Sequence, residues 1–160
     1  LRLSNAYGPR SLHKKSVVAA WLRAALAGRP QTINGDGHQT RDFIHSDDLA
    51  AAIQAALTAP SEAVAGGVYQ VGTGVETTVN ELAGALEQAV GTTLDIRHVP
   101  VRAGDILRNS CTVELAAERL GWRASIDLPA GLARTVAWFQ EALADPDLAA
   151  IAPDSRSGSE

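Results

Sequence analysis

The chain contains a single cysteine, Cys111, and no apolar run near the ~20 residues that a membrane-spanning helix needs. One cysteine excludes an internal disulfide bond and cannot form a thiolate metal site alone. We therefore interpret Cys111 as a small core residue and not as a nucleophile. The chain also does not open with the charged and apolar segments of a secretory signal. These absences predict a cytoplasmic protein.

Basic residues are scarce as well: 14 Lys and Arg stand against 18 Asp and Glu, and the formal net charge is −4. The chain has no global basic field that would attract nucleic acid or an anionic membrane, so we expect neither as a partner. A length of 160 residues with 46% apolar and 20% charged residues is ordinary for one globular domain with a hydrophobic core.

Catalytic and metal-binding motifs are missing too. We find no His-Glu-x-x-His, serine elbow, P-loop or paired-cysteine zinc spacing. The histidines stand in separate contexts, and we interpret them as surface or turn residues and expect no metal: His13, His38, His45 and His98. Gly72-Thr73-Gly74 follows an expected strand but lacks the third glycine of a dinucleotide-binding loop, so we reject that interpretation.

The most informative stretch is residues 34–53. The turn Asn34–Gly37 holds two glycines, which accept the positive φ of a tight turn. Arg41 stands just before the apolar pair Phe43-Ile44, at the mouth of an expected strand, where a loop can aim it into a cleft. Ser46–Asp48 then predicts a capped helix over 47–59, whose buried face includes Ile53.

Hydrophobic spacing predicts the other elements. Helices are expected at 17–27, 113–120 and 128–144, and another, capped by Thr77 or Thr78, runs through Val90. Strands are expected at 1–4, 31–33, 68–71 and 93–99. Residues 5–10 are expected to form a loop after the first strand, and residues 61–67 a surface loop. Little pattern remains beyond Asp145, so we expect residues 145–160 to be a disordered tail.

Arginine recurs on the expected loops: Arg10 near Asn5, then Arg41, then Arg102 near Asp105. Arginine suits phosphate because its planar guanidinium donates two parallel hydrogen bonds and stays charged. Two such residues at strand ends can clamp a diphosphate. Solvated surface arginines and an Asn5 that bonds only its own turn are the alternatives, and spacing alone does not decide between them.

Five segments resemble the extended short-chain dehydrogenases, the NAD-dependent sugar-nucleotide epimerase/dehydratase family. Residues 1–10 resemble its Arg-x-x-Asn-x-Tyr-Gly-Pro-Arg segment, and residues 34–53 its Gly-Asp-Gly-x-Gln-x-Arg-Asp-Phe-Ile segment. Residues 69–74 resemble Tyr-Asn-Ile-Gly-Thr-Gly, although Gln70 replaces the asparagine. Residues 102–105 and 120–122 resemble its Arg-x-Gly-Asp and Leu-Gly-Trp signatures. The segments are collinear, and the similarity covers nearly all of residues 1–143.

The resemblance implies an α/β fold: the C-terminal part of a Rossmann-like doubly wound sheet plus the smaller α/β substrate-binding lobe. Residues 1–144 would be the substrate-binding portion. The chain begins inside an expected strand at Leu1, so we expect it to be the C-terminal part of a longer protein. The family's glycine-rich NAD loop and its catalytic Tyr-x-x-x-Lys pair precede the segment that resembles residues 1–10. NAD would therefore be bound mainly by the absent N-terminal half, and this chain alone would be inactive.

The resemblance also implies roles for individual residues. Asn5 would bond the substrate diphosphate region, Arg41 and Arg102 would neutralise the phosphates, and Asp105 would contact the nucleoside sugar. Residues near Lys15 and Val17 would flank the base. The wall near the nicotinamide would be formed by Tyr7, Gly8 and Pro9.

Within the family, Asn34–Gly37 and the Gly-Pro-Arg-Ser-x-His-Lys run are most similar to UDP-hexose 4-epimerases. The complete protein would then interconvert UDP-glucose and UDP-galactose, or their N-acetyl forms, as a homodimer. A nucleotide-sugar 4,6-dehydratase or decarboxylase is the nearest alternative. A noncatalytic nucleotide-sugar binding module is an alternative of a different class.

Overall fold

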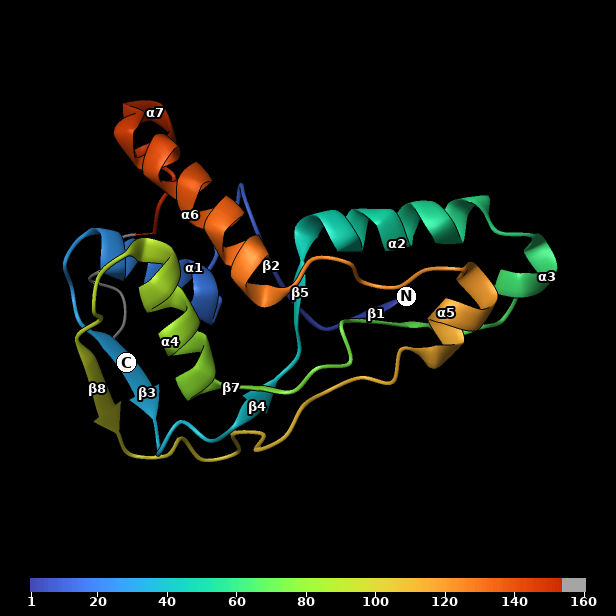
Figure 1. Ribbon diagram of the computed structural model, residues 1–160, viewed down its shortest axis with the longest axis horizontal. Helices are drawn as coiled ribbons and strands as arrows, with labels where there is room; N and C mark the ends of the chain where they lie inside the picture. Colours follow the sequence, from blue (N-terminus) through green and yellow to red (C-terminus); the bar gives the residue numbers. More distant parts are fainter. Residues whose placement is uncertain (154–160) are drawn as a thin grey trace.

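The computed structural model describes residues 1–153 and shows two parts side by side (Figure 1). The first, which we call the lobe, contains the parallel strands β3 (Gln31–Asn34) and β8 (Ile96–Val99). Helices α1 (Val17–Leu26), α4 (Val79–Val90) and α6 (Leu128–Ala144) pack against one another. They share one core with Ile33 of β3, and Phe139 of α6 is fully buried in it.

The second part, which we call the arm, is built on β1 (Arg2–Leu3), parallel to β6 (Gln70–Val71). Around this pair lie α2 (Ser46–Thr58), α3 (Ser61–Val64) and α5 (Glu114–Leu120) (Figure 1). The core of the arm is smaller than that of the lobe. Its buried apolar residues are Ile44, Ala52, Tyr69, Val71, Ala116, Leu120 and Trp122.

Two further strand pairs join the parts. Strand β2 (Asn5–Tyr7) runs parallel to β5 (Phe43–His45), and β4 (Thr40–Arg41) runs antiparallel to β7 (Thr77–Thr78). An irregular segment, residues 100–112, leaves β8 and crosses beneath both parts to reach α5 (Figure 1). We call this segment the strap. The α/β fold class expected from the sequence is thus present.

The predicted helices at 17–27 and 128–144 are confirmed to within one residue. Their ends carry local signals, such as Asp127, whose side chain accepts a hydrogen bond from the Ala130 N–H. Residues 5–7 are a strand and not part of a loop, because β2 finds a partner in β5. Residues 61–64 form a short helix inside the expected loop.

Two further expectations were wrong. Ile53 is 44% exposed, because α2 turns Asp48 and Ala52 inward in its place. The first residues of the expected disordered tail form a short helix, α7 (Pro146–Ala149). Asp145 caps this helix by accepting a hydrogen bond from the Asp147 N–H. The remainder of the predicted tail, residues 154–160, lies outside the described residues.

Candidate functional site

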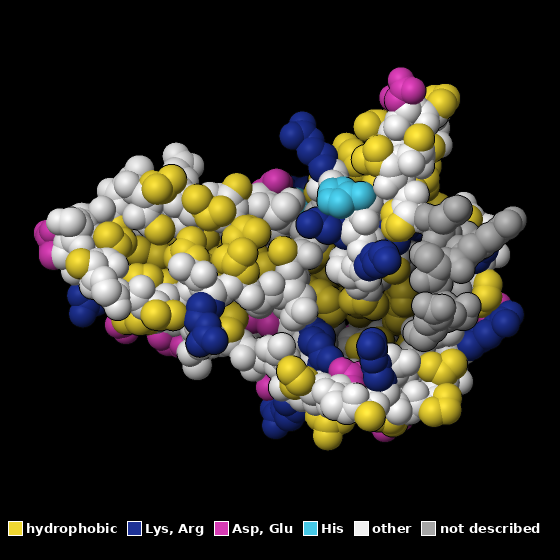
Figure 2. Space-filling model, turned by 180° about the vertical axis from the view of Figure 1, so that it is seen from behind, with side chains coloured by type: hydrophobic (Ala, Val, Ile, Leu, Met, Phe, Trp, Pro, Cys, Tyr) yellow, Lys and Arg dark blue, Asp and Glu magenta, His cyan; other side chains and the backbone are white. Residues whose placement is uncertain are grey.

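A cleft of about 400 Å³ lies in the lobe, between α1, β3, β4 and the strap. Its lining residues come from all these elements and from α4: Lys15, Val17, Ala20, Trp21, Thr32, Ile33, Asn34, Gln39, Arg41, Phe43, Val79, Arg102 and Asp105. Figure 2 shows a hollow of this kind on the lobe, with an apolar floor and dark blue basic side chains along its edges. Five of the six substrate-binding residues expected from the sequence therefore meet in one cavity: Lys15, Val17, Arg41, Arg102 and Asp105.

Arg41 is the most constrained of the cleft's basic residues. Its Nη2 lies 2.7 Å from Oδ1 of Asp105, and both side chains are about one-fifth exposed, 20% and 22%. Its Nη1 donates to the carbonyl oxygens of Thr40, at 2.8 Å, and Ile106, at 2.6 Å. Arg41 therefore ties the strap to β4 at the edge of the cleft.

The other two basic residues of the cleft are exposed. Lys15 precedes α1, and Arg102 lies on the strap. Within residues 1–153, neither side chain forms an ion pair. Between them the floor presents Val17, Trp21 and Phe43. An anion with an attached planar apolar group matches this arrangement, because the cations face the opening and the apolar side chains lie below.

The glycine turn after β3 is pinned to α4. Gly35 and Gly37 have φ of 71° and 78°, which confirms the predicted left-handed turn. Asn80 donates from Nδ2 to the Asp36 carbonyl at 2.9 Å, and a Cβ on Gly37 would lie only 2.1 Å from Asn80 Oδ1. This close packing fixes the start of the segment that leads to Gln39 and Arg41.

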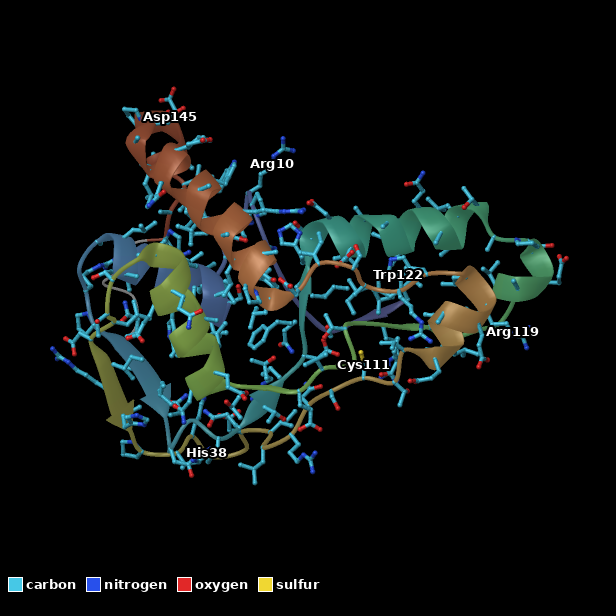
Figure 3. All side chains as sticks on the ribbon, in the orientation of Figure 1. Arg10, His38, Cys111, Arg119, Trp122 and Asp145 are labelled. Atoms are coloured by element: carbon cyan, nitrogen blue, oxygen red, sulfur yellow. The ribbon has the colours of Figure 1, made fainter. Side chains whose placement is uncertain are left out.

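Residues 5–10 lie outside the cleft. The Asn5 side chain donates from Nδ2 to the Asp42 carbonyl at 3.1 Å. The Tyr7 ring is buried against His45, with ring centroids 5.5 Å apart, and a Cβ on Gly8 would lie 2.2 Å from Ser46 Oγ. Arg10 points away from the body of the molecule in Figure 3. Of the three residues Tyr7, Gly8 and Pro9, Tyr7 packs its side chain into the hydrophobic core.

Asp42 is fully buried, and sequence reasoning missed its role. Its carboxylate accepts hydrogen bonds from Thr73 N at 2.9 Å, Thr73 Oγ1 at 2.8 Å and Gly74 N at 2.9 Å. The Gly72–Gly74 turn therefore has its amides committed to Asp42, which agrees with its rejection as a phosphate-binding loop. No sequence signal predicts this contact, because the partners are 31 and 32 residues apart.

Cys111 donates its S–H to the same carboxylate, with Sγ 3.1 Å from Asp42 Oδ2. Figure 3 shows Cys111 on the strap, toward the arm. Burial, reinforced by the Asp42 carboxylate, raises the pKa of the thiol to about 12. The residue is therefore a neutral thiol at physiological pH, which agrees with its interpretation as no nucleophile. Its predicted place in the core is wrong, because the side chain is only partly buried.

Asp48 and His45 form a second buried polar group, at the start of α2. The Asp48 carboxylate accepts from Ser125 N, Ser125 Oγ and Ile126 N, all within 3.1 Å, and so holds the segment that enters α6. His45 Nδ1 accepts from the Asp47 N–H at 3.2 Å, so this ring caps α2 in the place expected of Ser46. Burial lowers the pKa of His45.

Two negative findings apply to the part of the chain that the structure describes. No helix is long and apolar enough to cross a membrane. Residues 1–153 also contain no cluster of three or more His, Cys, Asp or Glu side chains that could hold a metal ion.

Comparison with known proteins agrees with this geometry. Residues 1–72 match the model of the NAD dependent epimerase/dehydratase family. The UDP-glucose 4-epimerase of Mycolicibacterium smegmatis is 40% identical over 139 residues, which is 86% of this chain and 44% of that protein. A dTDP-glucose 4,6-dehydratase of an Actinoplanes species is 36% identical over 140 residues, 87% of this chain and 42% of that one.

A solved structure supports the same assignment. The UDP-glucose 4-epimerase of Thermotoga maritima, solved with UDP-glucose, matches with a TM-score of 0.82 and 33% identity, over 89% of this chain and 45% of that one. The fold is thus the C-terminal part of a Rossmann-like α/β protein. The chain belongs to the NAD-dependent epimerase/dehydratase family of extended short-chain dehydrogenases. It spans about half the length of the relatives that it matches.

Proposed function

We propose that the complete protein is an NAD-dependent nucleotide-sugar epimerase, acting on UDP-glucose and UDP-galactose or their N-acetyl forms. This chain supplies the cleft that holds the nucleotide. The observation that carries the proposal is the meeting of Lys15, Val17, Arg41, Arg102 and Asp105 in one cavity. A volume of about 400 Å³ also lies within the usual range for small-molecule sites.

The cleft residues differ in chemistry, and each type suits a different part of the nucleotide. Arg102 offers an exposed cation to the diphosphate, Arg41 adds a second positive charge from the cleft wall, and Lys15 flanks the base. Val17 and Trp21 give the base an apolar surface. Asp105 keeps a second carboxylate oxygen for a ribose hydroxyl, because Arg41 bonds only Oδ1. Asn5 lies outside the cleft with its amide bonded to the Asp42 carbonyl, so its role in the diphosphate region stays a prediction.

The described residues do not fit a complete NAD site. The glycine-x-glycine turn after β6 has the amides of Thr73 and Gly74 bonded to Asp42, and Tyr7 is buried. NAD would supply the hydride-transfer chemistry of the proposed epimerisation. In our proposal it is held mainly by an N-terminal half, which also supplies the proton-transferring tyrosine, and Gly8 and Pro9 approach it through their backbone.

That half has a candidate docking face on the arm. Strand β1 pairs with β6 along one edge, and its other edge has no partner strand among residues 1–153. Several large apolar side chains of the arm are exposed: Leu1, Leu3, Ile53, Leu57 and Val68. Figure 2 shows apolar side chains gathered over the arm. The relatives are about twice as long as this chain, so the occupant we propose is the NAD-binding half, which would add a parallel strand to β1.

Product analysis tests the reaction. The complete protein is incubated with UDP-glucose and NAD, and the sugar products are followed by NMR. We expect UDP-galactose, and we expect Arg41→Ala to lower kcat/KM by about 10- to 100-fold through a lost charge-assisted contact. The relative that is a dTDP-glucose 4,6-dehydratase favours a second candidate reaction. A 4-keto-6-deoxy product would establish that reaction, and binding without any product would support a noncatalytic module.

A further inference from the structure

The strap carries two of the cleft residues, Arg102 and Asp105, yet it has no hydrophobic anchor. None of its residues, 100–112, is buried, and its apolar members are mostly exposed: Val101, Ile106 and Leu107. A segment without buried apolar contacts is positioned by its polar contacts or not at all. The position of Arg102 and Asp105 therefore depends on the hydrogen bonds and ion pairs that hold the strap.

Apart from the Cys111 S–H, which donates to Asp42, these polar contacts form two groups, one at β4 and one just before β7. At the cleft, Arg41 binds Asp105 and the Ile106 carbonyl, and the Thr40 N–H donates to the Leu107 carbonyl at 2.8 Å. The second group lies outside the cleft and centres on Glu76, between the Gly72–Gly74 turn and β7.

Glu76 contacts the strap through both carboxylate oxygens. Arg108 donates from Nη2 to Oε1 at 2.7 Å and from Nε to Oε2 at 3.1 Å, which is a two-point ion pair. Ser110 Oγ reaches Oε1 at 3.4 Å, and Thr40 Oγ1 donates to Oε2 at 3.1 Å. One carboxylate thus joins the strap to β4, the strand that carries Arg41. The guanidinium of Arg108, more than any other group, lowers the pKa of Glu76, so the pair is ionised at neutral pH.

We propose that Glu76 is a positioning residue for the cleft: by holding Arg108 and Ser110, it keeps the strap where Arg102 and Asp105 face the nucleotide. The inference rests on the proposed function, because the ligand is the nucleotide of that cleft. Glu76 does not line the cleft; its hydrogen bonds come from Arg108 and Ser110 of the strap and from Thr40 of β4. Arg41 fixes the strap from the cleft side, and Glu76 fixes it from outside.

The test uses the complete protein and compares Glu76→Gln with Arg108→Gln and with the double variant. Two quantities are measured: hydrogen exchange at the Thr40 amide, whose acceptor is the strap carbonyl of Leu107, and the affinity for UDP by calorimetry. We expect each single variant to speed Thr40 exchange and to raise the Kd for UDP about fivefold. The double variant should do no more than Glu76→Gln alone, because the ion pair that Arg108→Gln removes is already lost when Glu76 is replaced.

Asp95→Asn is the matched control, because it removes another carboxylate that pairs with an exposed arginine, Arg97, on β8. It should leave both quantities unchanged. Unchanged Thr40 exchange in Glu76→Gln would overturn the inference, and so would faster exchange with unchanged UDP affinity. Failure of the unaltered protein to bind UDP would overturn the proposed function, and Thr40 exchange would still report whether Glu76 anchors the strap.

Discussion

The lobe and the arm each consist of a parallel strand pair with helices around it, but they bury apolar side chains to different degrees. The lobe encloses large residues from three helices, among them Leu22, Leu82 and Phe139, each fully buried or nearly so. The arm has a smaller core and leaves several large side chains in solvent, including Leu57, which is 81% exposed. The cleft lies in the lobe, which has the larger hydrophobic core.

The difference in burial matches two different roles for the lobe and the arm. A cleft that must hold its charged side chains in fixed positions needs a well-packed support, which the lobe provides. The arm presents apolar surface that only another folded segment can cover, and exposed apolar patches of this kind mark such contacts. Two buried carboxylates, Asp42 and Asp48, connect the lobe and the arm. Substitutions at these two residues therefore test how far the two parts depend on each other.

The largest expected effect is from Asp42→Asn. The new amide group would face the donors of Thr73 and Gly74, and a buried network that loses its acceptor costs about 3 to 5 kcal/mol. The free energy of unfolding from urea titration measures the loss. Asp95→Asn, at an exposed position, should stay within about 0.5 kcal/mol. A fall of the same small size in Asp42→Asn would show that the parts do not depend on this contact.

Asp48→Asn should cost less, about 2 kcal/mol, because one carboxylate oxygen is replaced and some of the bonds from Ser125 and Ile126 are kept. The same urea titration gives the value. We further expect faster hydrogen exchange at Ser125 and Ile126, the two amides that bond Asp48. Exchange that stays at the unaltered rate would contradict this account of how the arm holds the start of α6.

Acid should lower the free energy of unfolding through protonation of His45, at the start of α2. Burial lowers its pKa in the folded state below the ordinary 6.5, so folding favours the neutral ring. The stabilisation is complete above about pH 6.5 and is lost as the pH falls from there through the folded-state pKa. His45→Asn keeps a side-chain acceptor for the Asp47 N–H but does not titrate. Its unfolding free energy should fall less between about pH 7 and pH 5.5; equal slopes would exclude His45 as the source.

The smallest effect on stability is expected from Leu57→Ser. The side chain is almost fully exposed, so the unfolding free energy should change by less than about 0.5 kcal/mol. Self-association of the isolated chain should nevertheless decrease, because the apolar surface of the arm shrinks. Analytical ultracentrifugation compares the two. An unaltered chain that is strictly monomeric at high concentration would show that the arm needs no cover.

Sequence reasoning succeeded where the information is local. The helix at 128–144 has a capping aspartate and regular apolar spacing, and the left-handed turn at Gly35 and Gly37 follows from the residue type. It failed at Ile53, where apolar spacing predicts burial but the side chain is exposed. Asp42 was read only as part of a family segment, because its partners come from distant parts of the chain.

The cleft shows the same limit. Arginine chemistry alone predicts that Arg41 and Arg102 suit a phosphate, but they lie 61 positions apart in the numbering, and nothing local brings them together. The family resemblance placed both in one site, and the structure brings them to one cavity. Neither the spacing nor the resemblance indicated that Arg41 would already be bonded to Asp105, because that contact depends on how the strap lies across β4.

The most direct test of the central claim is a calorimetric titration of UDP into the complete protein, unaltered and as Arg102→Gln. Arg102 is exposed and lies outside both cores, so its replacement should remove the proposed phosphate contact without disturbing the fold. The account predicts binding by the unaltered protein and about a 10- to 100-fold rise in Kd for the variant, with Arg97→Gln as the exposed-arginine control that leaves Kd unchanged. Equal affinity for UDP in Arg102→Gln and the unaltered protein would contradict it.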